Sequence, residues 1–161
     1  MMMEHPAEII VRLATLDDAG FLVRGNAQMA LETEKLSLDL DRLRRGVRSV
    51  FEDPSRGFYL IAELDRKKVG QMMITYEWSD WRDGVFWWIQ SVYTVPEARR
   101  RGVFRALYAH SEALAQQQGS VCGLRLYVDI HNHAAQETYR RCGMRETAYR
   151  MFEVDNVIGI R

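Results

Sequence analysis

The stretch that decides the fold covers residues 85–115, VFWWIQSVYTVPEARRRGVFRALYAHSEALA. Residues 86–95 are apolar or β-branched on both alternating faces, which predicts a strand buried inside a sheet. Pro96 cannot donate a hydrogen bond to a neighbouring strand, so we expect the strand to end there. From Val103 the pattern becomes helical, with Val103, Ala106, Leu107, His110 and Leu114 on one side.

Three arginines crowd the predicted start of this helix. Arg99, Arg100 and Arg101 lead directly into Gly102. A helix N-terminus carries roughly half a positive charge, and a cation placed there loses about 0.3–1 kcal/mol. The arrangement favours an anion among these residues, because free backbone N–H groups and guanidinium groups suit a phosphate or pyrophosphate. A solvated basic turn is the alternative.

Length and composition favour one domain spanning residues 1–161. A chain of 161 residues is long enough for a hydrophobic core. Lysine plus arginine and aspartate plus glutamate both number 22, so the formal net charge is zero. This balance gives no global attraction to nucleic acid or to acidic membranes, and we expect neither as a partner.

The two cysteines, Cys122 and Cys142, are too few for a disulfide framework. The sequence shows no run near the roughly 20 apolar residues of a spanning helix, and its first residues lack a signal-peptide pattern. We therefore expect a soluble, cytoplasmic protein.

The other elements follow from periodicity, capping residues and turn residues. Strands are expected over residues 8–13, 58–64, 68–78, 86–95, 124–128 and 144–154. Helices are expected over residues 16–30, 103–118 and 132–142, with a break at 31–36. A further helix is expected to start at Ser37 or Asp39 and to run to about residue 51. A strand, a helix and a second strand in this order require a parallel crossover, so we predict an α/β sheet with helices on both faces.

Two motifs resemble those of the GNAT superfamily of acetyl-CoA-dependent N-acetyltransferases. The stretch VYTVPEARRRGVFRALY is similar to the family's strand followed by a Q/R-x-x-G-x-G/A loop, with Phe104 where Gly or Ala is usual. The stretch NHAAQETYRRCGM looks like the family's N-x-x-A-x-x-x-Y-x-x-x-G pattern, with Asn132, Ala135, Tyr139 and Gly143 in place. Two motifs in the right order are more specific than either alone.

The resemblance implies a mixed, splayed central β-sheet and a cofactor cleft where the strands at 86–95 and 124–128 part. This agrees with the rule that ligands bind beyond the carboxyl ends of parallel strands. It also implies acetyl transfer to a primary amine by direct attack in a ternary complex. We expect a small-molecule amine rather than a protein lysine or N-terminus as the acceptor, and a homodimer is compatible with the family.

The resemblance also assigns roles to the residues that match its motifs. Tyr93, Thr94 and Val95 should pair with the pantetheine arm like an added strand, where ordinary strand pairing is the alternative. Asn132 should cap its helix or contact the pantetheine. The pyrophosphate should be wrapped by Arg99, Arg100, Arg101, Gly102, Val103, Phe104 and Arg105.

Tyr139 is the expected catalytic residue, as general acid toward the departing thiolate. A phenol with a pKa near 10 and a thiol near 8.5 are close enough to share a proton. The alternative is a packed aromatic side chain whose hydroxyl finds any partner.

The strand at 86–95 has no carboxylate to deprotonate the amine, so the general base stays open. Glu32 is the first choice, on the acceptor side, and Trp88 is a candidate for an aromatic acceptor pocket. Asp129, His131 and His133 do not complete a metal shell, and we expect no metal. Other candidate bases are a water chain and Glu34, Glu77, Asp80 and Asp83.

Two rival functions remain. A non-catalytic acyl-CoA-binding or sensing module would use the same cleft. A nucleic-acid binder would need a wide basic face, which zero net charge argues against.

Overall fold

The structure is a computed structural model that describes residues 8–158 of the chain. The chain forms two compact units, Met1–Tyr127 and Val128–Arg161, which are described in turn. The elements of the first unit are β1 (Ile9–Leu13), η1 (Leu16–Asp18), α1 (Ala19–Glu34), α2 (Leu40–Glu52), β2 (Phe58–Leu64), β3 (Lys67–Ser79), η2 (Asp80–Arg82), β4 (Gly84–Thr94), η3 (Pro96–Ala98), α3 (Val103–Gln118) and β5 (Val121–Arg125).

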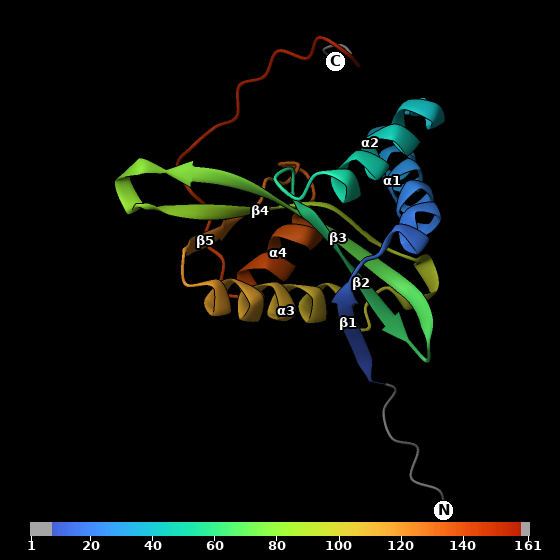
Figure 1. Cartoon of the computed structure of the whole chain (residues 1–161), viewed down its shortest axis with the longest axis horizontal. Helices are drawn as coiled ribbons and strands as arrows, with labels where there is room; N and C mark the ends of the chain where they lie inside the picture. Colours follow the sequence, from blue (N-terminus) through green and yellow to red (C-terminus); the bar gives the residue numbers. More distant parts are fainter. Residues whose placement is uncertain (1–7, 159–161) are drawn as a thin grey trace, which may run out of the picture. The chain divides into compact units, whose positions relative to one another are not determined.

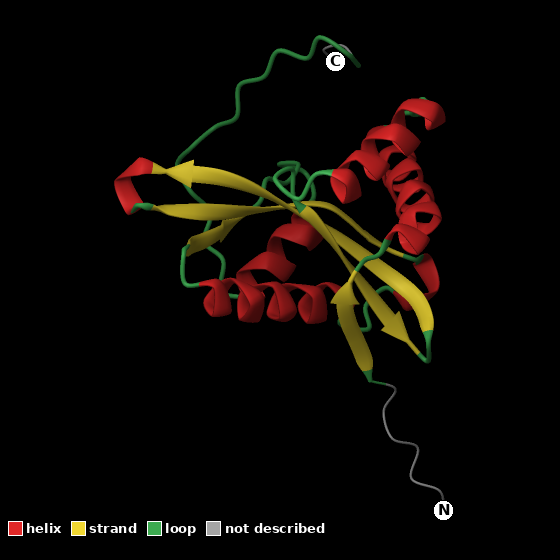
Figure 2. Cartoon of the chain, viewed as in Figure 1, coloured by secondary structure: helices red, strands yellow, loops and turns green. Residues whose placement is uncertain are grey.

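One five-stranded sheet runs through the first unit in the order β1-β2-β3-β4-β5 (Figure 1). The strands β1 to β4 pair antiparallel with one another, and β5 pairs parallel with β4. The helix α3 connects the two parallel strands, as predicted from the strand-helix-strand order. Figure 2 shows the short η2 turn joining the long strands β3 and β4. The predicted mixed α/β sheet is confirmed.

Helices cover both faces of the sheet, because alternate strand residues pack against different helices. Tyr59 and Ile61 of β2 belong to a buried cluster with residues of α1 and α2. Ala62 is on the opposite face, where its paired residue Gly70 lies against Val103 of α3. Both sets of strand residues are therefore buried, which explains the nearly continuous apolar sequence of β2.

Two predicted boundaries in this unit were wrong. The break expected at residues 31–36 is wrong, because α1 continues to Glu34. The polar residues of this last turn lie on the outer side of the helix, where they do not interrupt it. Lys35 then ends the helix in the left-handed region, with φ of 56°. The last strand is β5, Val121–Arg125, rather than residues 124–128. Its start was missed because Gly123 interrupts the apolar pattern by which a strand is predicted.

The second unit contains one helix, α4 (His133–Arg141), in its described part. Asn132 caps this helix, because its side-chain Oδ1 accepts a hydrogen bond from Ala135 N at 3.1 Å, as predicted. The expected closing strand at residues 144–154 is wrong, since the structure has no strand there. An apolar, β-branched pattern favours a strand, but a strand also needs a partner to pair with.

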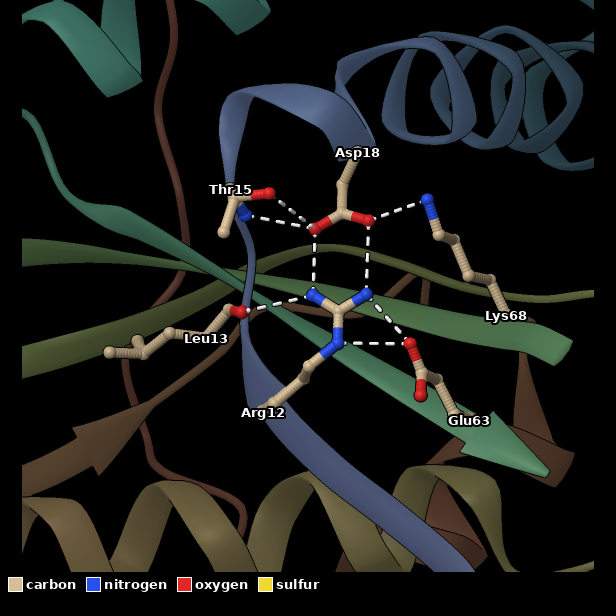
Figure 3. Close-up of polar contacts among 6 residues, drawn as sticks. All are labelled: Arg12, Leu13, Thr15, Asp18, Glu63 and Lys68. Carbon is tan, nitrogen blue, oxygen red and sulfur yellow. Dashed lines mark hydrogen bonds and ion pairs between the residues drawn. The ribbon is translucent and has the colours of Figure 1, made fainter. Parts of the chain in front are cut away.

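A network of charged side chains ties β1 to β2, β3 and η1 (Figure 3). The Arg12 guanidinium lies between Asp18, at 2.7 Å, and Glu63, at 2.6 Å. Lys68 binds the other oxygen of Asp18 at 2.6 Å, and the Thr15 N–H donates to the same carboxylate. Asp18 is 1% exposed, so every one of its partners compensates a charge removed from water.

The bidentate contact with Arg12 holds the pKa of Asp18 well below its ordinary value, although burial acts in the other direction. The carboxylate therefore stabilises the fold at any pH above about 4, where it is ionised even in the unfolded chain. This contribution is lost as the pH falls below that value, toward the pKa of the folded state.

We predict that Asp18→Asn lowers the free energy of unfolding by about 2–4 kcal/mol at pH 7. The variant leaves Arg12 and Lys68 without their shared partner, and their partial exposure keeps the loss below that of a wholly buried pair. Urea unfolding followed by circular dichroism measures the effect.

Asp41→Asn is the matched control, because its ion pair with Arg44 is exposed and should contribute less than about 1 kcal/mol. The gap between wild type and Asp18→Asn should also narrow below about pH 4. Equal effects of the two variants at pH 7 would contradict the role of the network.

Candidate functional site

The parallel strands β4 and β5 part halfway along β4. They pair from Val85 to Trp88 only, whereas β4 continues to Thr94. Beyond Trp88 one edge of β4 has no neighbouring strand within residues 8–158, and the other edge stays paired with β3. This is the predicted splay. Its free edge offers backbone N–H and C=O groups with which an extended ligand can pair as an added strand.

A β-bulge lies on this stretch of β4. Gln71 of β3 pairs with Tyr93, and Met73 pairs with Gln90, so two β4 residues oppose a single β3 residue. One of these two, Ser91, has φ of 49°, in the left-handed region. A bulge leaves its extra residue outside the regular hydrogen-bond ladder and re-aims the side chains that follow.

The bulge places side chains from both halves of β4 on one face of the sheet. Trp88 and Gln90 pair with Thr75 and Met73, and Met73 packs against the cluster formed with α1 and α2. Tyr93 shares this face, since the Tyr93 ring lies beside Gly25 of α1. A strand that alternated regularly would have directed Tyr93 to the face covered by α3.

The turn between β4 and α3 has the geometry expected of an anion site. Arg100 and Gly102 both adopt positive φ, at 63° and 83°, and α3 begins at Val103. A Cβ on Gly102 would meet no atom within 4 Å, so the space in front of the helix is open. Arg100, Arg101 and Arg105 are exposed and form no ion pair within residues 8–158. These features suit a phosphate group at the first turn of α3.

Arg99 is occupied differently from the other arginines of this turn. Its guanidinium binds Glu32 of α1 at 2.6 Å and lies 5.6 Å from the centre of the Tyr93 ring. Its Nε also donates to the Thr94 carbonyl at 3.1 Å. Arg99 therefore joins the end of α1 to the end of β4, and any phosphate contact would have to compete with Glu32.

Glu32 is held as a carboxylate by its neighbours. A hydrogen bond from Gln28 at 3.0 Å, with the ion pair to Arg99, keeps the pKa of Glu32 below its ordinary value. A carboxylate with a lowered pKa is a weaker base.

Phe104, the departure from the usual small residue, lies on the first turn of α3. Its ring stacks on Tyr108 one turn later, with centroids 6.1 Å apart. The neighbouring residue, Val103, is the one that faces the sheet and is 2% exposed. A large side chain is thus accommodated along the helix.

Trp88 belongs to a polar and aromatic cluster on the α1-α2 face. Its indole N–H donates to Glu77 at 3.2 Å, and Arg125 of β5 forms an ion pair with the same carboxylate. The Tyr127 ring lies 6.2 Å from Trp88, and Arg125 lies over Phe86. The cluster can offer an aromatic surface and a carboxylate to an acceptor.

Tyr139 is on α4, in the second unit. Burial raises the pKa of the Tyr139 phenol, and Cys142 adds to the rise. The phenol is therefore protonated at neutral pH and has a proton to donate. The catalytic role of Tyr139 stays a prediction.

Within residues 8–158, no group of three or more His, Cys, Asp or Glu side chains is arranged to hold a metal ion. No helix in that range is both long enough and apolar enough to cross a membrane.

The chain matches the family model described as "Acetyltransferase (GNAT) family" over residues 26–144. The protein is a member of the GNAT acetyltransferase family. No curated protein matches the chain.

Solved structures with this fold include several acetyltransferases. A possible acetyltransferase from Clostridium difficile is 40% identical, covers 92% of this chain and 98% of its own, and has a TM-score of 0.85. An aminoglycoside N-acetyltransferase in complex with CoA is 14% identical, with 97% and 100% covered and a TM-score of 0.75. A predicted acetyltransferase from Clostridium acetobutylicum, with acetyl-CoA, is 16% identical, with 92% and 96% covered and a TM-score of 0.73.

Sequence reasoning missed three features of the first unit. Arg125 and Tyr127 fall on or just after β5, where the boundary was misplaced. Gln71 was not singled out, although a polar residue inside the apolar run of β3 was a signal that it needs a buried partner.

Proposed function

We propose that the protein transfers an acetyl group from acetyl-CoA to a primary amine, by direct attack in a ternary complex. The observation that carries the proposal is the free edge of β4 beyond Trp88, which leads directly to the open first turn of α3. The edge suits the pantetheine arm and the turn suits the pyrophosphate. A small-molecule amine is the proposed acceptor.

The residues at the end of β4 and the start of α3 hold the co-substrate in this proposal. Backbone groups of Tyr93, Thr94 and Val95 pair with the amides of the pantetheine arm. N–H groups at Gly102, Val103, Phe104 and Arg105 face the pyrophosphate, with Arg100 and Arg101 adding charge and Arg99 shared with Glu32. Asn132, besides capping α4, is the proposed contact of the second unit with the pantetheine.

The reaction needs one bond formed and one broken. The neutral amine attacks the thioester carbon, the C–S bond breaks, and the amine proton leaves to a base or to water. Tyr139 either gives its proton to the departing sulfur, which then leaves as the thiol of CoA, or stabilises the departing thiolate through a strong hydrogen bond. A backbone N–H of β4 stabilises the negative charge that develops on the carbonyl oxygen.

Glu32 and Trp88 are proposed to line the acceptor side. The lowered pKa makes Glu32 better suited to attracting a cationic amine than to removing its proton at neutral pH. Trp88, with Glu77 beside it, provides an aromatic surface for the acceptor.

The deciding experiment is thermal unfolding with CoA and with acetyl-CoA, followed by turnover with a panel of amines. A ligand at a hundred times its Kd adds about 2.7 kcal/mol, which raises the Tm by roughly 5–10 °C in a domain of this size. Thioester turnover with an amine supports the proposal. A Tm shift without turnover on any amine would favour the non-catalytic acyl-CoA-binding module, and the absence of a shift would overturn both.

We predict that Gly102→Ala weakens CoA binding by about tenfold or more, because a Cβ would enter the space in front of α3 where the pyrophosphate is proposed. Isothermal titration measures the Kd.

Gly119→Ala is the matched control. Gly119 caps the opposite end of the same helix, also has positive φ, at 67°, and also faces open space. Both variants should lose a similar free energy of unfolding, about 1–2 kcal/mol, from the strained backbone. CoA affinity that falls equally in both variants would contradict the proposed pyrophosphate site.

Tyr139→Phe should lower kcat by about 100-fold while leaving the Kd for acetyl-CoA nearly unchanged, since the phenol acts on the leaving sulfur. The wild-type enzyme is active while Tyr139 is protonated, and the raised pKa keeps the phenol protonated to higher pH. An alkaline limb of the rate profile that belongs to Tyr139 should disappear in the variant.

Tyr149→Phe is the control, as it removes a phenol from the same unit outside the family motif. If Tyr139→Phe turned over at the wild-type rate, Tyr139 would have no role in the chemistry.

A further inference from the structure

The side chain of Gln71 reaches from β3 to the bulge of β4. Its Nε2 donates to the Ser91 carbonyl at 3.2 Å, across the strand pair. Gln71 is 0% exposed, so its end of this hydrogen bond is shielded from water.

The oxygen of the same Gln71 amide is unpaired within residues 8–158. This Oε1 atom is buried and accepts no hydrogen bond from the described residues. A buried polar atom left unpaired costs roughly 1–3 kcal/mol, which offsets the roughly 1 kcal/mol gained from the hydrogen bond to Ser91, so the Gln71 amide adds little net stability. The amide therefore calls for a role other than stability.

The helix α1 leaves room for this amide. Gly25 lies so close that a Cβ there would be 2.2 Å from Oε1 and 3.2 Å from the Tyr93 ring. Any larger residue would push the amide away from Ser91. The close packing of Gly25 thus holds the Gln71 amide in the orientation that reaches Ser91.

The bulge itself needs such support. Ser91 has positive φ, which is unfavourable for a residue with a Cβ by about 1–2 kcal/mol. A strained backbone persists only when its surroundings determine it. The hydrogen bond from Gln71 is attached to the strained residue itself.

We propose that Gln71 is a positioning residue for acetyl transfer, whose amide holds the Ser91 peptide so that the bulge presents a backbone N–H to the acyl carbonyl of acetyl-CoA. The inference rests on the proposed function. The N–H comes from the part of β4 where one edge lies free of β5 and the ladder with β3 is interrupted. Gln71 acts through this backbone and does not touch the reacting atoms.

The test compares Gln71→Met with the wild-type protein. Methionine has a similar shape and removes both the donor and the unpaired Oε1, so the Tm and the Kd for CoA should change little. The carbonyl stretch of bound [1-13C]acetyl-CoA, in difference infrared spectra, should lie at lower frequency in the wild-type protein than in solution. In the variant it should return toward the solution value.

Thr75→Val is the matched control. Thr75 accepts a hydrogen bond from Gln90 at 2.7 Å between the same two strands, and this bond does not involve the Ser91 peptide. The variant therefore removes one cross-strand side-chain hydrogen bond without touching Ser91 and should keep the wild-type carbonyl frequency. Turnover on an amine found in the panel should fall about 100-fold in Gln71→Met only.

Gln71→Glu adds a pH readout that loss of packing would not give. A protonated carboxyl can donate to the Ser91 carbonyl, whereas the ionised form repels it, and burial favours the protonated form. The carbonyl frequency of this variant should move toward the wild-type value as the pH is lowered.

The outcomes separate this inference from the proposed function. If Gln71→Met binds CoA and keeps both the wild-type frequency and turnover, the inference is wrong and the proposed function stands. If the wild-type protein binds neither CoA nor acetyl-CoA, the proposed function itself fails. If Gln71→Met is unfolded, Gln71→Glu at low and high pH decides, and an unchanging frequency there would overturn the inference.

Discussion

The parting of β4 from β5 is the constraint on which the candidate site depends. The two strands pair over only the first part of β4, up to Trp88, and within residues 8–158 the strand that pairs with β4 beyond that point is β3. Hydrogen-bonding groups that another sheet would use internally are thereby left at an edge. The same parting brings the open first turn of α3 to the end of this edge, so that one ligand could contact both.

The proposed acceptor side depends on a different requirement, that side chains gather on one face of the sheet. The bulge of β4 gives Trp88 and Tyr93 a common face although their spacing in the sequence is odd. Arg99 then joins Tyr93 to Glu32 at the end of α1. In the proposed function the co-substrate contacts the backbone of β4 and the acceptor contacts its side chains, so that one strand would serve both.

The sequence was informative where a single local cause determines the structure. Pro96 ends β4, Gly102 starts α3 and Asn132 caps α4, because each effect depends on one residue and its immediate neighbours. It was uninformative where partners far apart decide. Residues 144–154 have the composition of a strand without being one, and the bulge is contacted by Gln71, which is 20 residues from Ser91. Neither can be read from local periodicity.

The charged network at β1 has a consequence for how the chain can change over time. Its two cations, Arg12 and Lys68, balance the two anions, Asp18 and Glu63, around the buried carboxylate of Asp18. Replacing one partly buried member alone leaves a net charge beside this carboxylate, so a replacement that keeps the balance alters a cation and an anion together. Sequences that carry a different set of side chains here are separated from this one by less stable intermediates. The choice of side chain at Arg12 of the first strand is therefore constrained by Glu63, which lies some 50 positions away.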